Sequence, residues 1–157
     1  MSSEVQILVF ELDRQRYGLH LSAVERVLRA VEVTPLPQTP DVVWGVVDIQ
    51  GQIVPVLSLR KRFGLSERPI GVSDQFVLAR TLQRRVALVV DVACSVIEQT
   101  AANVIESDKI LPHLEQIEGV IQIEDGIVLI HDLDRFLSLE EERALARAMT
   151  SQANHGP

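Results

Sequence analysis

Hydrophobic and polar residues follow an extended pattern through the segment 45–65, which reads GVVDIQGQIVPVLSLRKRFGL. Two short apolar runs in this segment are separated by Gln50-Gly51, where the glycine favours a turn. Ser58 then precedes a short basic stretch, Arg60-Lys61-Arg62, where it can cap a helix. The pattern therefore predicts a strand, a turn, a second strand and a short helix, and this unit is the centre of the predicted fold.

The second strand of this unit is apolar on both faces. Ile53 and Val54 alternate along it, so we expect both side chains to be buried. Pro55 has no backbone N–H to donate, so on that side the strand should lie at a sheet edge or at a bulge. Together these features predict a wall of a small β barrel.

A short helix is predicted upstream of this unit. Ser22 and Glu25 stand three residues apart, which is a capping-box pattern. Val24, Val27 and Leu28 would then lie on one side of the helix.

The pattern of the first half of the chain recurs in the second half. A shift of 69 residues lays the predicted hairpin 5–21 on 74–90, and a shift of 74 lays 45–59 on 119–133. The pairs that are identical under these shifts are Gln6/Gln75, Arg16/Arg85, Leu19/Leu88, Val27/Val96, Gly45/Gly119, Val46/Val120, Ile49/Ile123, Ile53/Ile127, Val54/Val128 and Leu59/Leu133. We interpret the recurrence as two copies of one small β unit, packed as two subdomains. Chance alternation in a Val-rich sequence is the alternative.

The repeat suggests how the chain is divided. We expect one domain over 1–157, with approximate internal halves at 5–65 and 74–137. A second capping-box pattern predicts a C-terminal helix at 138–149, and the small polar residues 150–157 should form a flexible tail.

The composition is that of a folded chain with an acidic balance. Of 157 residues, 46% are hydrophobic and 24% charged, and the formal net charge is -7. Phosphate binding needs clustered Lys and Arg, so we expect no nucleic-acid partner. The sequence has no signal-peptide pattern and no run of about 20 apolar residues, so we expect a cytoplasmic protein without membrane insertion. The lone Cys94 should be a small buried residue in a reducing compartment.

Motifs of the common enzyme classes are absent from the sequence. The four histidines lack metal-ligand spacing, and no GxSxG, Walker, GxGxxG or HExxH motif occurs. The nearest approach to a site is His131 with Asp132 and Asp134, which leaves open a small-molecule-binding or enzymatic β domain with a His/Asp cleft. The competing interpretation is that Asp132 caps a helix and His131 is a partly buried strand residue. We expect no enzyme, no cofactor and no metal.

Two further features could mark a binding surface. Trp44, the single tryptophan, can be a core residue or an interface anchor. The basic stretch Arg60-Lys61-Arg62 can be a solvated helix face or a docking point for an acidic partner.

The pattern GVxxxxGxIVPVxxLRxRFG spans residues 45–64. With it, the chain resembles the CheW family over nearly its whole length, and the other matching segments are 7–12, 17–19, 22–25, 37–41, 89–92 and 127–137. The resemblance implies a mainly β CheW-like domain with two SH3-like five-stranded β barrels, short helices and a C-terminal helix. It also implies a non-enzymatic adaptor in a bacterial chemosensory complex. Its partners would be the regulatory domain of a CheA-type histidine kinase and the cytoplasmic helical tip of a chemoreceptor.

The chain departs from the family pattern at positions that matter for partners. Gln50 stands where the family usually has an Arg that contacts partners, and Arg26 stands where a Glu is common. Ala87 replaces a usual Gly. Guided by the resemblance, we select as protein-interaction candidates Val24, Arg26, Val27, Leu36, Trp44, Gly45, Gln50 and Gly51. The valines and Leu36 would face an apolar groove, although core packing is the alternative for each valine.

Overall fold

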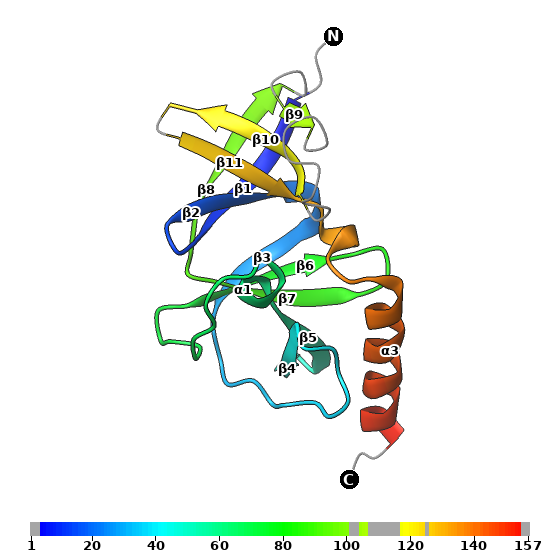
Figure 1. Ribbon diagram of the computed structural model, residues 1–157. Coiled ribbons are helices and arrows are strands. Elements are labelled where there is room, and N and C mark those ends of the chain that lie inside the picture. Colours follow the sequence, from blue (N-terminus) through cyan, green and yellow to red (C-terminus); the bar gives the residue numbers. More distant parts are fainter. Residues whose placement is uncertain (1–3, 101–103, 107–116, 125, 155–157) are drawn as a thin grey trace.

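The computed structural model describes residues 4–100, 104–106, 117–124 and 126–154, and for residue 106 and residues 151–154 it describes the backbone alone (Figure 1). The strands are β1 (Glu4–Leu12), β2 (Gln15–His20), β3 (Val24–Arg29), β4 (Val43–Ile49), β5 (Gln52–Ser58), β6 (Gln75–Arg80), β7 (Arg85–Val90), β8 (Val92–Thr100), β9 (Val104–Glu106), β10 (Ile117–Ile123) and β11 (Gly126–His131). The helices are α1 (Leu59–Arg62) and α3 (Leu139–Asn154), with 3-10 turns η1 (Leu21–Ala23) and η3 (Leu133–Arg135).

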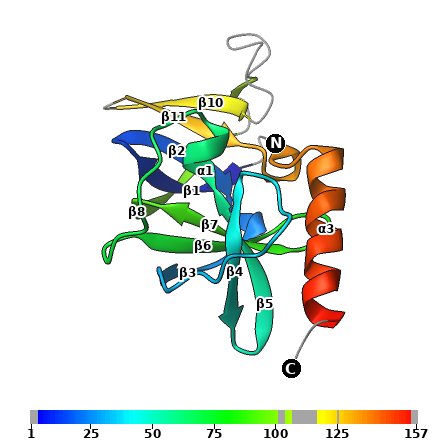
Figure 2. The same ribbon diagram turned by 60° about the horizontal axis from the view of Figure 1, so that its bottom comes forward.

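The strands form two sheets. One has the order β8-β1-β2-β11-β10-β9 and the other the order β3-β6-β7-β5-β4. The pairing is antiparallel except between β11 and β2 and between β5 and β7. Figure 2 shows α3 running along one side of the molecule, beside β5. The mainly β class is therefore confirmed, with six strands instead of five in one sheet, and closure of the sheets into barrels stays a prediction.

Each sheet combines strands from both halves of the sequence. The β1–β2 hairpin pairs with β8 and β11, whereas β6 and β7 pair with β3 and β5. Val56 lies opposite Ala87 in one sheet, and Ile130 lies opposite Gly18 in the other. A shift of 74 carries Val56 onto Ile130, and a shift of 69 carries Gly18 onto Ala87. The two sheets thus repeat one register, but neither is built from one half alone, so the expected packing of one half per subdomain is corrected.

Three of the four groups of buried side chains found among the described residues lie on or between the sheets. One group lies on a face of each sheet, and a third, the shared core, lies between the sheets and takes Leu145 from α3. Alternation along β5 explains the division, because Val56 belongs to the five-stranded sheet's own group and Leu57 to the shared core. The shared core therefore fixes the sheets and the C-terminal helix relative to one another.

The central unit has the predicted order of elements, but one residue is placed differently. Ser58 Oγ accepts a hydrogen bond from the backbone N of Lys61 (3.1 Å), which confirms the predicted cap of α1. Val54 is buried as predicted, whereas Ile53 is 52% exposed because it lies next to the turn, so its predicted burial is wrong. Pro55 lies in an interior strand, yet the registered pairs with β7 begin only at Val56. The missing backbone N–H of Pro55 therefore removes no hydrogen bond from the paired part of the β5–β7 ladder.

The helix predicted from Ser22 is wrong. The residues after η1 form β3, in which Val24 pairs with Ala79 and Val27 with Val77 on β6. The capping-box pattern is a local signal, whereas pairing with β6 gives the β-branched residues a ladder and a packed face. The non-local pairing therefore overrides the cap.

Two other expectations are corrected. Cys94 is exposed on β8, which contradicts its expected burial, and its thiol donates to Glu11 Oε2 (3.2 Å). Partial desolvation, together with this carboxylate, raises the pKa of the thiol to about 11. The helix α3 continues through Asn154, beyond the predicted end, while the remaining tail residues 155–157 lie outside the described residues.

The predicted capping box at the start of α3 is present, because Ser138 Oγ accepts a hydrogen bond from the backbone N of Glu141 (3.1 Å). Within the part of the chain that is described, no helix is long and apolar enough to cross a membrane.

Candidate interaction surface

The His/Asp cleft left open by the sequence is contradicted by the structure. His131 is 1% exposed and lies edge-on between Phe63 and Phe136, with ring centroids 5.3 and 5.5 Å away. Burial, and secondarily the charge of Arg62, lowers the pKa of His131 to about 3, so the ring is neutral. A neutral ring enclosed by aromatic side chains cannot exchange protons with a substrate.

The neighbouring carboxylates serve local backbone geometry. Asp132 accepts from the backbone N of Asp134 (3.1 Å) and caps η3. Asp134 accepts from the backbone N of Leu82 (2.8 Å) and so fixes the β6–β7 turn. His113 and His155 lie outside the described residues, and the described residues contain no group of three or more potential metal ligands.

The candidates on β3 divide between two environments. Val24 and Val27 are half-buried and pack against the shared core, so core packing is present and their groove-facing role stays a prediction. Arg26 is exposed, and no ion-pair partner for it occurs among the described residues. A register shift between Val24 and Arg26 marks a bulge in the edge strand. The strand therefore offers a partly accessible apolar face next to a free positive charge.

The β4–β5 turn carries Gln50 and Gly51 at an exposed tip. Both residues have positive φ, 52° and 86°, which is the backbone of the tight turns that join twisted strands. Asp48 Oδ1 accepts from the backbone N of Gly51 (2.8 Å) and fixes the turn. The Gln50 side chain is thus held on a rigid, solvent-facing loop.

Leu36 does not join the valines in a groove. It is buried against Val46 and Ala148 of α3. The helix covers it in the free protein, so its predicted position in an open groove is corrected.

Gly45 allows a close approach of two backbone segments. Its φ is 153°, and a Cβ at this position would lie 2.1 Å from the carbonyl oxygen of Thr34. Thr34 and Val46 exchange two backbone hydrogen bonds of 2.9 and 2.8 Å beside it. Gly45 therefore lets the connector between β3 and β4 pack against β4. This is a structural role inside the protein.

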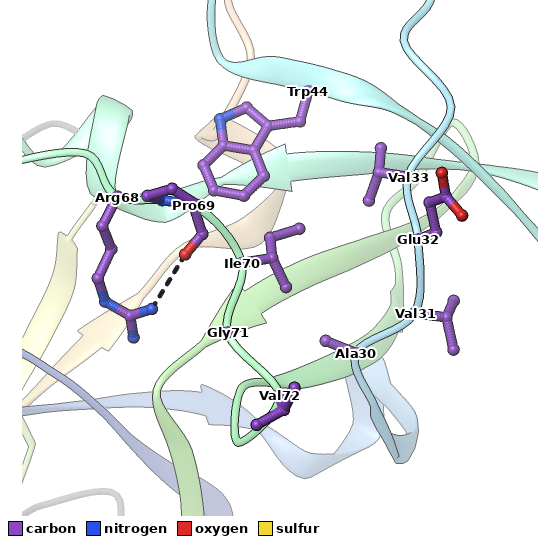
Figure 3. A pocket seen from close by; sticks show the side chains of 10 residues that line it. All are labelled: Ala30, Val31, Glu32, Val33, Trp44, Arg68, Pro69, Ile70, Gly71 and Val72. Carbon is purple, nitrogen blue, oxygen red and sulfur yellow. Dashed lines mark hydrogen bonds between the residues drawn. The ribbon is translucent and has the colours of Figure 1, made fainter.

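Trp44 forms part of a hollow that sequence reasoning missed. The hollow has a volume of about 530 Å³ and is lined by the segments 30–33 and 68–72 on opposite sides of the indole (Figure 3). Trp44, Val33 and Ile70 are half-buried and pack on the five-stranded sheet's own group. The two segments that line the hollow are nearly 40 positions apart in the sequence. The signal in the sequence that could have indicated the hollow was a pair of apolar segments with neither strand nor helix periodicity.

Ion pairs hold the 68–72 wall. Arg68 donates to both carboxylate oxygens of Asp74 (2.8 Å each) and to Asp91 (2.8 Å). Asp74 is 2% exposed and also accepts from the backbone N of Gly71 (2.7 Å). Burial alone would raise the pKa of Asp74, but the bonds from Arg68 and Gly71 lower it below its usual value. The carboxylate is charged at neutral pH and fixes the wall.

The chain is similar to known proteins over nearly its full length. Residues 6–147 match the model of the family described as CheW-like domain. The chemotaxis protein CheW of Treponema pallidum is 24% identical, covering 91% of this chain and 88% of the relative, and that of Klebsiella aerogenes is 27% identical, covering 87% and 83%. The crystal structure of the scaffolding protein TtCheW from Thermoanaerobacter tengcongensis superposes with a TM-score of 0.79 at 25% identity, covering 90% of this chain and 92% of that one. The chain belongs to the CheW-like domain family.

Proposed function

We propose that this chain is a non-enzymatic adaptor that couples a CheA-type histidine kinase to chemoreceptors in a bacterial chemosensory complex in the cytoplasm. The observation that carries the proposal is the family match over residues 6–147, together with the fold shared with the scaffolding protein TtCheW. His131 is enclosed, and Asp132 and Asp134 bind backbone N–H groups. These roles agree with a protein that binds partners and does not catalyse a reaction.

Two surfaces suit the two partners. The accessible sides of Val24 and Val27 offer apolar area to one face of an amphipathic helix, which is how a receptor helical tip would dock. Arg26 and the rigid turn at Gln50 and Gly51 offer polar contacts to the kinase regulatory domain. Arg26 has no ion-pair partner among the described residues, so it would select a carboxylate on that domain.

The test is a pair of titrations of the full chain, one with an isolated kinase regulatory domain and one with a receptor cytoplasmic helical hairpin. We expect both to bind, and Val27→Asp should weaken receptor binding at least tenfold, because it places a charge in the apolar contact. Leu82→Asp is the control, because Leu82 is 86% exposed and lies on the β6–β7 turn. If the unmodified chain binds neither protein, the proposal is wrong.

A further inference from the structure

We propose that the hollow around Trp44 is a docking site for an extended peptide of another protein. One apolar side chain of this peptide inserts beside the indole, and its backbone pairs with residues 31–33. The peptide carries Lys or Arg next to the inserted residue. This proposal goes beyond the adaptor function and rests on the geometry of the hollow alone.

The hollow has the size and the lining of a side-chain pocket. Its volume of about 530 Å³ is within the range of ligand pockets, about 300–1,000 Å³, and far exceeds the space of one water. Figure 3 shows Ile70 below the indole of Trp44 and Val33 beside the indole, on the other wall. These three side chains also pack on the core of the sheet, so the floor is fixed before a ligand arrives.

Two valines extend the apolar surface to the rim. Val31 is 52% exposed and Val72 is 91% exposed, one on each wall of the hollow. Single exposed apolar residues are ordinary on protein surfaces, but Val72 lies beside an apolar floor. Val31 projects from the outer side of its segment, as Glu32 does, so it offers apolar surface to the neighbours of the inserted residue (Figure 3).

The 30–33 wall presents open backbone groups. At one end Ala30 N donates to the carbonyl of Asp74 (3.0 Å), and at the other Thr34 is paired with Val46. Within the described part of the chain, the backbone groups of Val31, Glu32 and Val33 make no hydrogen bond. A segment fixed at both ends and unpaired in its middle is suited to strand addition, in which a partner's backbone supplies the missing bonds.

The charges favour a basic peptide. The guanidinium of Arg68 is occupied by Asp74, Asp91 and the carbonyl of Pro69, so it is not available to an acidic ligand. Glu32 is exposed, has no ion-pair partner among the described residues and projects from the outer side of its segment (Figure 3). Neighbouring residues of an extended peptide face opposite ways, so the residue next to the inserted one can reach Glu32.

The experiment begins with a phage-displayed library of random nine-residue peptides, selected on the immobilised full chain. Val72→Asp serves for counter-selection, since so exposed a residue can be changed without altering the core. We expect enriched sequences in which an apolar residue is next to Lys or Arg. A synthetic enriched peptide without tryptophan should shift the emission of Trp44, the single tryptophan, on titration.

Matched variants and peptides then test each contact. Val72→Asp and Glu32→Lys should each weaken binding at least tenfold, while Leu82→Asp and Glu140→Lys, at exposed positions outside the hollow, should leave it unchanged. N-methylation of alternate peptide amides should abolish binding, because it removes the donors that strand pairing needs. Failure to enrich any peptide, equal binding to Val72→Asp, or indifference to N-methylation would overturn the proposal. None of these results depends on whether the chain binds a kinase or a receptor.

Discussion

Arg60 Nη2 lies 2.8 Å from both carboxylate oxygens of Asp91, and this ion pair joins the two sheets. Arg60 is in α1, after the last strand of the central unit, and Asp91 lies between β7 and β8, where the chain passes from one sheet to the other. The same nitrogen is 2.8 Å from Asp13 in the β1–β2 turn. Burial opposes the charge of Arg60, but the hydrogen bonds to Asp91 and Asp13 raise its pKa above the usual value.

Removal of this guanidinium should be costly. The side chain of Arg60 is 8% exposed, so Arg60→Met leaves Asp91 without its main partner, although Arg68 remains beside it. We expect the free energy of unfolding to fall by about 3 kcal/mol in urea titrations. Lys61→Met is the control, because Lys61 is exposed and lies 3.7 Å from Glu67, and it should cost less than about 1 kcal/mol. Equal losses in the two variants would show that the pair does not join the sheets.

His131 should make the protein less stable in acid. The unfolded chain takes up a proton near pH 6.5, whereas folded His131, with its pKa lowered to about 3, does not. Between these values the unfolded state binds more protons, so stability is lost as the pH falls. The contribution of this one group approaches about 1.4 kcal/mol per pH unit.

His131→Phe should remove this contribution while keeping the contacts with the neighbouring rings. The variant also removes two buried ring nitrogens that have no hydrogen-bond partner among the described residues, so it should be at least as stable at pH 7. The measurement is urea unfolding of both proteins from pH 4.5 to 7.5. The carboxylates make the same contribution to the pH dependence of both proteins, so the difference between the two curves reports on His131. Parallel curves would mean that His131 takes up its proton in the folded state.

Gly45 and Gly51 require glycine for two different physical reasons. Both have positive φ, but a Cβ on Gly45 meets the carbonyl of Thr34, whereas a Cβ on Gly51 meets nothing within 4 Å. Gly51→Ala should therefore cost about 1–2 kcal/mol, the price of the left-handed backbone alone. Gly45→Ala should cost clearly more, because it also pushes Thr34 away from Val46. Thermal melts of the two variants compare them directly, and similar shifts would contradict the close approach.

Neighbouring positions of β5 should respond differently to truncation. Val54 is 1% exposed, so Val54→Ala should lower the free energy of unfolding by about 2–4 kcal/mol through lost burial and a cavity. Ile53→Ala should cost less than about 1 kcal/mol, because half of that side chain is already in water. Denaturant titrations measure both, and a large loss for Ile53→Ala would place that side chain in the core after all.

Local patterns predicted the elements whose cause is local. The turn at Gln50 and Gly51, the cap at Ser58 and the capping box at Ser138 each depend on residues within a few positions, and all three are present. The pattern at Ser22 is equally local, but β3 is decided by pairing with β6, about 50 positions away. A local pattern gives a wrong prediction where pairing with a distant strand stabilises the segment more than a helix cap would.

The repeat predicted equivalent elements but not their partners. Shifts of 69 and 74 identify Val56 with Ile130 and Gly18 with Ala87, yet a shift cannot tell whether a strand pairs within its own copy or with the other copy. The hollow at Trp44 was hidden for the same reason, since its walls come from two distant connectors. The distribution of Val24 and Val27 between core and surface likewise depends on where the second sheet lies.

The last prediction concerns the choice of partner and depends on Gln50 and Arg26. Both side chains are exposed, and Arg26 has no ion-pair partner among the residues described, so neither is committed to the fold. The family's Arg at the first position can form a charge-assisted contact that Gln50 cannot form, and Arg26 repels a basic patch matched to the usual Glu. The chain should therefore bind a typical CheA-type regulatory domain more weakly than a typical family member does.

Gln50→Arg together with Arg26→Glu should strengthen this binding about tenfold at low salt. Charges at an exposed rim act mainly on the association rate and are screened by salt, so the gain should shrink at high salt. The measurement is the association and dissociation rate of both proteins at two salt concentrations. Gln83→Arg is the control, because it adds the same positive charge as Gln50→Arg at an exposed position on another turn. If the double variant and the unmodified chain bind equally at both salt concentrations, these two positions do not face the regulatory domain, and partner choice must lie elsewhere on the surface.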